Sequence, residues 1–230
     1  TPLVPAGIEL TFNPGPHIDN PVREPADLDR LRFPEPWSGT EFLSETLERV
    51  RNGLGPETAL IGFSGAPWTL ATYMVEGATS KSFTRAKAFA HHHPGIFDSF
   101  VDRVADAMAG YLRTQVAHGA QAVQIFDSWV GALGAEDARR WALTPARRLL
   151  EQIGDLGVPR IYFANNGSHL LHDMPEMPCE VIGLDCHIGS QLTDMEPLLE
   201  SLRHLLGMVD TLAAEGIGIK EGETRPDTIP

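Results

Sequence analysis

Two patterns of apolar and polar residues alternate along this chain. Short continuous apolar runs, which are typical of strands buried in a parallel sheet, occupy residues 58–63, 121–126, 159–163, 180–184 and 217–220. Between them, apolar residues recur three or four positions apart, as on one face of an amphipathic helix. This spacing predicts helices over residues 39–54, 94–118, 135–153 and 194–214, and a helical turn at 168–172.

Strands that alternate with helices predict a parallel sheet covered by helices. No GxGxxG motif follows the first predicted strand, which disfavours a dinucleotide-binding fold. We therefore expect an α/β fold of the (β/α)8 TIM-barrel type. Such a barrel takes about 250 residues and eight strand–helix units, whereas only five or six strands can be recognised here, so we expect an incomplete barrel. Residues 1–230 are expected to form one domain that ends in a polar tail at 218–230.

Composition narrows the possible partners. The chain has 230 residues and a formal net charge of −13, from 31 acidic and 18 basic residues, which argues against nucleic acids and anionic membranes as partners. A local cluster of arginines could still hold an anionic substrate. The sequence contains no apolar run long enough to span a membrane and no secretory start. We expect a soluble, cytoplasmic protein.

The sequence gives little support for a metal site or a disulfide bond. The consecutive histidines at 91–93 point in different directions on a helix and cannot converge on one ion, so we expect them to end a helix before Pro94. His169, His172 and Asp173 could share a face, but nothing else indicates a metal. The two cysteines match no disulfide framework and no CxxC pattern. We predict no metal site.

Residues 61–77 read IGFSGAPWTLATYMVEG and form the most informative segment of the chain. Glycines and Pro67 make a turn after an apolar run, and a helical stretch with Tyr73 and Glu76 follows. A strand, a turn and a helix start place functional groups at the carboxyl end of a strand, where α/β folds carry their chemistry. We expect Glu76 to brace this turn and not to act as a general acid.

This segment resembles a signature of the uroporphyrinogen decarboxylase family. The resemblance extends over residues 1 to about 185 and includes GIELTFNPGPHIDNPVR near the start and QIFDSWVG at 124–131. It implies a carboxy-lyase of haem and porphyrin biosynthesis that needs no cofactor. Such an enzyme decarboxylates the acetate side chains of the tetrapyrrole uroporphyrinogen III and yields coproporphyrinogen III. Members are often dimeric, which makes a homodimer a possible assembly of this chain.

By this resemblance, Tyr73 and Ser128 are expected to contact substrate. The phenol of Tyr73 would donate a hydrogen bond to a substrate carboxylate; the alternative is a helix tyrosine with its ring in the core. Ser128 would lie at the mouth of the barrel; the alternative is a cap of the following helix. Phe126 could be an apolar wall of the pocket or a core residue. Asp127 is expected to be a loop acid.

Several charged residues of the family have no counterpart in the sequence. Its arginine-rich motif and the aspartate that holds the pyrrole N–H groups would precede Thr1, and its late histidine would follow the point where the resemblance ends. His169, His187 and His204 do not lie in a context that could replace that histidine. We therefore expect that these 230 residues alone do not decarboxylate uroporphyrinogen.

A second resemblance begins near residue 184. The segment 184–217, with the core His-Ile-Gly-Ser-Gln, resembles diaminopimelate decarboxylase, a pyridoxal-phosphate enzyme. By this resemblance His187 would stack on the cofactor ring and Ser190 would lie near its phosphate. The Schiff-base lysine and the phosphate loop of that family have no counterpart here. The alternatives to the first reading are therefore a protein related to this pyridoxal-phosphate decarboxylase and a non-catalytic composite of residues 1–185 and 186–217.

Overall fold

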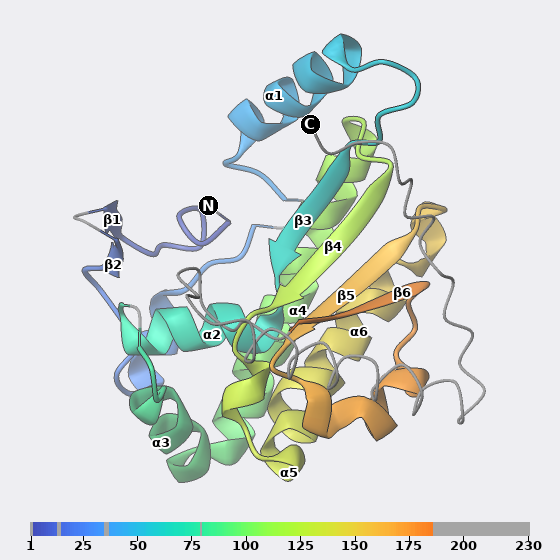
Figure 1. The fold of residues 1–230 in the computed structure, drawn as a ribbon. Coiled ribbons are helices and arrows are strands. Elements are labelled where there is room, and N and C mark those ends of the chain that lie inside the picture. The colour runs from blue at the N-terminus through green and yellow to red at the C-terminus, as the bar shows by residue number, and fades with distance from the viewer. Residues whose placement is uncertain (1, 13–14, 35–36, 79, 186–230) are drawn as a thin grey trace, which may run out of the picture. The chain divides into compact units, whose positions relative to one another are not determined.

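A computed structural model describes residues 2–12, 15–34, 37–78 and 80–185 of the chain (Figure 1). The chain divides into two compact units, Thr1–Asp185 and Cys186–Pro230, and everything described below belongs to the first. The helix predicted over 194–214, the strand predicted over 217–220, and the residues His187, Ser190 and His204 lie outside the described residues.

The first unit is built on a parallel four-stranded sheet in the order β3-β4-β5-β6 (Figure 1). The register aligns Gly65 of β3 with Phe126 of β4, and Phe126 with Phe163 of β5. All carboxyl ends therefore meet at one edge. These strands confirm four of the five predicted apolar runs, and their bounds are Ile61–Gly65 for β3, Ala122–Asp127 for β4, Arg160–Asn165 for β5 and Val181–Asp185 for β6.

Helices follow the strands as the apolar spacing predicts. The helix expected over 135–153 is continuous but contains one π-helical turn, η3. The turn expected at 168–172 opens a longer 3-10 helix, η5. The bounds are η1 Pro25–Arg30, α1 Glu41–Gly53, α2 Pro67–Glu76, α3 Thr84–His92, α4 Pro94–Ala117, η2 Val130–Ala132, α5 Ala135–Ala138, η3 Arg139–Leu143, α6 Thr144–Gln152, η4 Gly154–Leu156 and η5 Ser168–Glu176.

The first 32 residues contain a small hairpin that the sequence pattern does not predict. Strand β1, Leu10–Phe12, pairs antiparallel with β2, Pro16–Ile18. Each strand has only three residues, too few to show the alternation by which strands are recognised. Proline and turn residues around them hide the pattern further.

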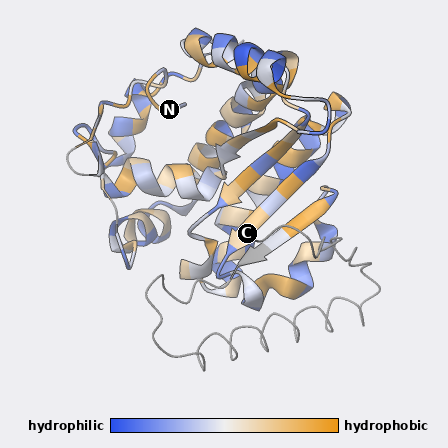
Figure 2. Ribbon diagram, turned by 45° about the horizontal axis from the view of Figure 1, so that its top comes forward, coloured by the Kyte–Doolittle hydropathy of each residue, from blue (hydrophilic) through white to orange (hydrophobic). Residues whose placement is uncertain are grey.

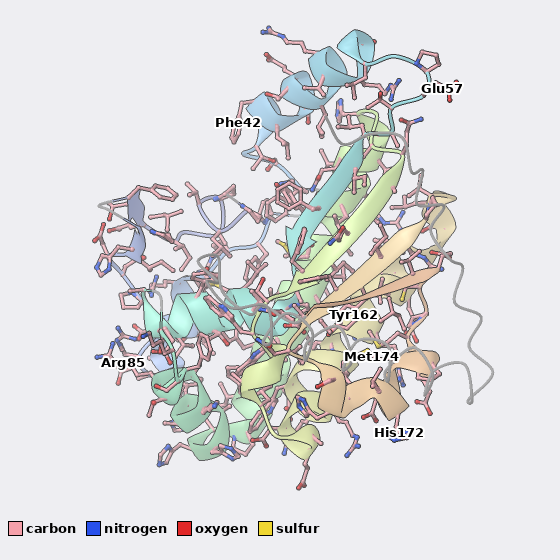
Figure 3. The ribbon with its side chains drawn as sticks, in the orientation of Figure 1. Phe42, Glu57, Arg85, Tyr162, His172 and Met174 are labelled. Atoms are coloured by element: carbon pink, nitrogen blue, oxygen red, sulfur yellow. The ribbon has the colours of Figure 1, made fainter. Side chains whose placement is uncertain are left out.

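The hydrophobic core lies between the sheet and the helices α2, α4 and α6. Strand β4 shows how the sheet divides its faces, because Val123 and Ile125 are buried toward the helices whereas Gln124 and Phe126 are only half-buried. Figure 2 shows hydrophobic residues, in orange, along the strands and helices of this unit. Side chains that are almost fully buried include Trp68, Phe97, Phe100, Met108, Leu112, Trp141 and Tyr162, the last of which is labelled in Figure 3.

The opposite face of the sheet is open on strand β3. Ile61 and Phe63 are 47% and 60% exposed there, whereas the strands of a parallel sheet are usually buried on both faces. Across the described residues the parallel sheet has four strands and does not close into a barrel. The parallel sheet and its covering helices confirm the predicted α/β fold.

Candidate functional site

The turn after β3 brings helix α2 directly onto the carboxyl edge of the sheet. The backbone N–H of Ala66 donates to the carbonyl of Phe126 at 2.8 Å, which ties the turn to β4. Gly65 allows a close approach at this point, since a Cβ atom on it would lie 2.8 Å from the side chain of Leu70. Pro67 then starts α2, where its missing N–H costs no hydrogen bond. The local sequence therefore fixes the helix that carries Tyr73.

Asp127 ends β4 and is fully buried. One carboxylate oxygen accepts a hydrogen bond from the Thr69 hydroxyl at 2.9 Å, and the other accepts one from the Tyr162 hydroxyl at 2.8 Å. Burial raises the pKa of Asp127 to about 6, against the opposing effect of these two hydrogen bonds. The carboxylate thus joins α2, β4 and β5 below the carboxyl edge.

The expectation that Asp127 is a loop acid is therefore wrong. The residue continues the alternation of β4, so its side chain lies on the same buried face as those of Val123 and Ile125. That alternation is visible in the sequence and could have placed it correctly. An acid at the end of an apolar run is usually solvated, and only the donors from two other elements make burial possible here.

Tyr73 packs against Trp129, a residue that the sequence analysis did not single out. Their ring centroids lie 3.9 Å apart with the planes tilted by 45°. Trp129 also contacts Phe83, with 4.7 Å between ring centroids, and its carbonyl accepts a hydrogen bond from the Trp68 indole at 3.1 Å. Burial raises the pKa of the Tyr73 phenol, so the hydroxyl stays protonated at neutral pH and can donate a hydrogen bond.

The backbone of Phe83 shows that this aromatic cluster is tightly built. Phe83 adopts φ = 53°, a left-handed conformation that costs a residue with a side chain about 1 kcal/mol. The hydroxyl of Ser80 accepts the Phe83 N–H at 3.0 Å, and the ring packs on Trp129. Packing and this hydrogen bond hold the strained residue in place.

Ser128 follows Asp127 at the same edge and is half-buried. Its carbonyl accepts a hydrogen bond from the Asn165 side-chain amide at 3.0 Å, which joins the ends of β4 and β5. The position that caps η2 is Trp129, so Ser128 does not serve as the cap that was considered as its alternative role. Because Trp129 is its neighbour in sequence and packs on Tyr73, the two predicted substrate residues are brought to one edge.

Two further features of this edge involve Asn165 and a glycine. The side-chain oxygen of Asn165 is buried without a hydrogen-bond partner in the described part of the chain. Gly131 lies so close to the turn after β5 that a Cβ atom on it would approach Asn166 Cβ to 2.4 Å. Only glycine fits there, and the close approach fixes the segment after Ser128.

Glu76 braces the turn after α2 and not the turn before it, for which this role was expected. Its side chain is buried and accepts the backbone N–H of Ala86, in the first turn of α3, at 3.0 Å. The Arg23 guanidinium donates to the carbonyls of Val75 and Glu76 at the end of α2, where the helix dipole favours a cation. These contacts position α2 and leave Glu76 no role at the carboxyl edge.

Phe126 belongs to an aromatic row on the open face of the sheet. Its ring lies 5.9 Å from that of Phe63 and 5.6 Å from that of Phe163, in edge-on arrangements. The row crosses β3, β4 and β5 next to their carboxyl ends. This position agrees better with an apolar wall than with a core residue.

The histidines have local partners. His91 lies 3.0 Å from the Asp137 carboxylate and His92 lies 2.6 Å from the Ala88 carbonyl; both lie in the last turn of α3, which ends before Pro94 as predicted. His169 contacts the Leu133 carbonyl at 3.0 Å. Asp173 accepts a hydrogen bond from Arg139 at 2.7 Å.

The described residues offer no candidate for a metal site or for a membrane-spanning helix. No group of three or more histidine, cysteine, aspartate or glutamate side chains there could hold a metal ion. No helix of this part of the chain is long and apolar enough to cross a membrane.

Comparison with solved structures supports the class of fold. The chain superposes on a methyltransferase from Methanosarcina mazei with a TM-score of 0.64, over 78% of this chain and 53% of that one. The sequences are only 18% identical, so this likeness concerns the fold alone. Together with the parallel sheet and its covering helices, it places the protein among α/β folds of the barrel type.

Comparison of sequences gives the family. The model described as uroporphyrinogen decarboxylase (URO-D) matches residues 1–214, and the chain belongs to this family. The uroporphyrinogen decarboxylase of Bacillus velezensis is 39% identical over 188 residues, which are 82% of this chain and 53% of the relative. That of Thermus thermophilus is 41% identical over 81% of this chain and 55% of its own length. The chain thus spans about half the length of the curated relatives it matches.

Proposed function

We propose that this chain supplies part of the substrate site of a uroporphyrinogen decarboxylase, a carboxy-lyase that converts uroporphyrinogen III to coproporphyrinogen III. The observation that carries the proposal is the Tyr73–Trp129 pair at the carboxyl edge, in a chain that belongs to this family. The protonated phenol of Tyr73 would donate a hydrogen bond to a carboxylate of the tetrapyrrole. Ser128 would offer a second hydroxyl next to it.

The open face of the sheet suits the body of such a substrate. The row Phe63, Phe126 and Phe163 forms an apolar surface beside the carboxyl ends of three strands. Aromatic rings of this kind pack favourably on a flat macrocycle. The reaction needs no cofactor in this proposal, because a protonated pyrrole ring accepts the electron pair that the departing carbon dioxide leaves behind.

The site proposed for this chain lacks cations for the many carboxylates of the substrate. Transition-state stabilisation of charge requires fixed donors or counter-ions aimed at it, and the family's arginine motif and aspartate have no match in residues 1–230. We therefore propose that the chain does not catalyse decarboxylation alone. A cytoplasmic location and a homodimer are further parts of the proposal, which the family membership suggests.

The resemblance of residues 184–217 to diaminopimelate decarboxylase stays a hypothesis. The uroporphyrinogen decarboxylase model reaches residue 214 and so covers most of that stretch, which favours continuity of one family. We expect no absorbance band of a lysine aldimine when pyridoxal phosphate is added to the chain. Appearance of such a band would support the second resemblance and weaken the main proposal.

A chimera tests the main proposal. Residues 1–185 would replace the matching part of the Bacillus subtilis relative, which is 38% identical to this chain, and coproporphyrinogen formation would be measured. We expect activity in the chimera and its loss by tenfold or more, about the cost of one charged hydrogen bond, in Tyr73→Phe. Tyr111→Phe, a buried tyrosine of α4, serves as the matched control. Equal activity of the Tyr73→Phe and Tyr111→Phe chimeras would refute the role of Tyr73.

A further inference from the structure

A large cavity lies on α4 and α6, two helices that run side by side behind the sheet (Figure 1). Its volume is about 970 Å³, within the range of small-molecule sites. Three parts of the chain line it: the segment 31–34 with Trp37, one face of α4, and the last turns of α6. We call it the arginine groove, after Arg32, Arg103, Arg113 and Arg148 in its lining.

The groove concentrates positive charge in an acidic chain. Asp106 is the single carboxylate among the described residues that line the groove, whereas the whole chain carries a net charge of −13. Arg148 forms two hydrogen bonds with Asp106, at 2.7 and 3.0 Å, and Arg113 pairs with Asp155 at 2.6 Å. These two arginines are therefore partly neutralised.

Arg32 and Arg103, the other two arginines of the groove, are not neutralised by a carboxylate in the described part of the chain. Arg103 donates to the carbonyls of Leu28 and Leu31 at 3.4 and 3.0 Å, and Arg32 donates to the carbonyls of Asp29 and Leu31. Within the described part of the chain, neither forms an ion pair with a carboxylate. Backbone carbonyls orient these guanidinium groups but do not cancel their charge, so the groove retains two positive charges for an anion.

Flat apolar surfaces lie between these charges. The Phe33 ring lies 5.6 Å from the guanidinium carbon of Arg103. Trp37 is held by a hydrogen bond from its indole to Thr40 at 2.8 Å and by an edge contact with Tyr111 at 5.3 Å. The adjacent part of α4 contributes the small residues Ala107, Ala109 and Gly110 to the lining, and a Cβ atom on Gly110 would lie 3.5 Å from Trp37. The groove therefore combines cations with a rigid, ring-sized surface.

The two arginines without an ion pair limit the ligand. Arg32 precedes Phe33 in the lining of the groove, and the guanidinium carbon of Arg103 lies 5.6 Å from the centre of the Phe33 ring. Both cations therefore lie beside the same aromatic surface. A planar ring system with carboxylates on its rim could pack its face on Phe33 and Trp37 and direct carboxylates at both guanidinium groups.

We propose that the arginine groove binds a planar aromatic polycarboxylate at a site separate from the carboxyl edge of the sheet. The ligand class follows from the groove alone. One compound of this class is an oxidised aromatic tetrapyrrole related to the substrate. The choice of this compound rests on the proposed function. Binding there would let such a compound occupy the protein without blocking Tyr73 and Ser128.

A titration of the 230-residue chain with uroporphyrin, an aromatic octacarboxylate, tests this proposal. The double variant Arg32→Gln/Arg103→Gln is expected to bind about tenfold or more weakly, because each guanidinium lost removes a charged hydrogen bond. In Gly110→Leu the leucine side chain would occupy part of the groove. This variant is therefore expected to weaken binding without a change in the charge of the protein. Arg49→Gln, an exposed arginine of α1 paired with Glu45, serves as the matched control.

The outcomes separate this proposal from the proposed function. Loss of affinity in the groove variants with unchanged affinity in Tyr73→Phe supports the groove, whatever the result of the chimera. Unchanged affinity in both Arg32→Gln/Arg103→Gln and Gly110→Leu would overturn it. Loss of affinity only in Tyr73→Phe would also overturn it and would support the carboxyl edge as the tetrapyrrole site. Circular dichroism of each variant verifies that Arg103→Gln has not released the segment near Leu28.

Discussion

The carboxyl edge of the sheet and the arginine groove offer different chemical groups to a ligand. At the edge, Tyr73, Ser128 and Trp129 offer neutral donors and rings, and Asp127 is buried below them. In the groove, guanidinium groups face solvent beside aromatic rings. The edge therefore supplies neutral hydrogen-bond donors and aromatic rings, whereas the groove supplies positively charged guanidinium groups beside aromatic rings. A polycarboxylate ligand needs both, which is why each region can be tested by removal of what it supplies.

The largest expected effect comes from Asp127, the buried acid that joins α2, β4 and β5 below the edge. Asp127→Ala leaves the hydroxyls of Thr69 and Tyr162 buried without partners, which should lower the free energy of unfolding by about 4 kcal/mol. Urea denaturation measures this change. The matched control is Asp155→Ala, which removes an exposed acid beside the groove. A loss below about 1 kcal/mol for Asp127→Ala would show that the buried carboxylate does not hold the edge together.

The pH dependence of the same group gives a second test. The pKa of Asp127 is about 6 in the folded chain and near its ordinary value of about 3.9 in the unfolded chain. The folded state therefore binds the proton more tightly, and its relative stability falls as pH rises between these two values. The total loss is about 3 kcal/mol by linkage.

Asp127→Asn isolates that contribution, since an amide cannot titrate and the two hydroxyls can rotate to accept or donate. The free energies of unfolding of the original chain and of Asp127→Asn, measured between about pH 4 and pH 7, should diverge in favour of the variant as pH rises. Parallel curves would show that the carboxylate does not titrate in this range.

An intermediate effect is expected from the aromatic cluster. Trp129→Ala removes a half-buried ring from Tyr73 and Phe83 and should cost roughly 2 kcal/mol of stability. It should also lower the pKa of Tyr73 toward its ordinary value, because the phenol becomes more exposed. Spectrophotometric titration of tyrosinate, with Tyr73→Phe subtracted, follows this pKa. If the pKa of Tyr73 stays raised in Trp129→Ala, residues other than Trp129 bury the Tyr73 phenol.

The smallest effect is expected at the rim of the groove. Arg113 and Asp155 form a surface ion pair at 2.6 Å, and such pairs contribute less than about 1 kcal/mol. A double-mutant cycle of Arg113→Ala and Asp155→Ala should give a coupling energy in this range. A much larger coupling would mean that the groove is held together by its charges and is not simply a surface that carries them.

Much of the edge could be read from the sequence. The motif at 61–77 predicted the strand, the turn and the helix of Tyr73, and the resemblance placed Ser128 at the next strand end. Trp129 and Phe83 were missed because their contact joins segments that are 46 positions apart, and no local pattern encodes it. Asp127 was misread because its burial depends on donors from α2 and β5.

The sequence by itself determined the alternation of strands and helices, the family and the position of Tyr73 on the helix that follows a strand end, since these follow from local spacing and a contiguous motif. Tertiary structure alone decided which side chains meet. It buried Asp127 between Thr69 and Tyr162, packed Trp129 on Tyr73, and gathered arginines from a loop and two helices around one groove. The physical reason is that burial and charge proximity depend on distances in space, which residues far apart in the chain acquire only when it folds.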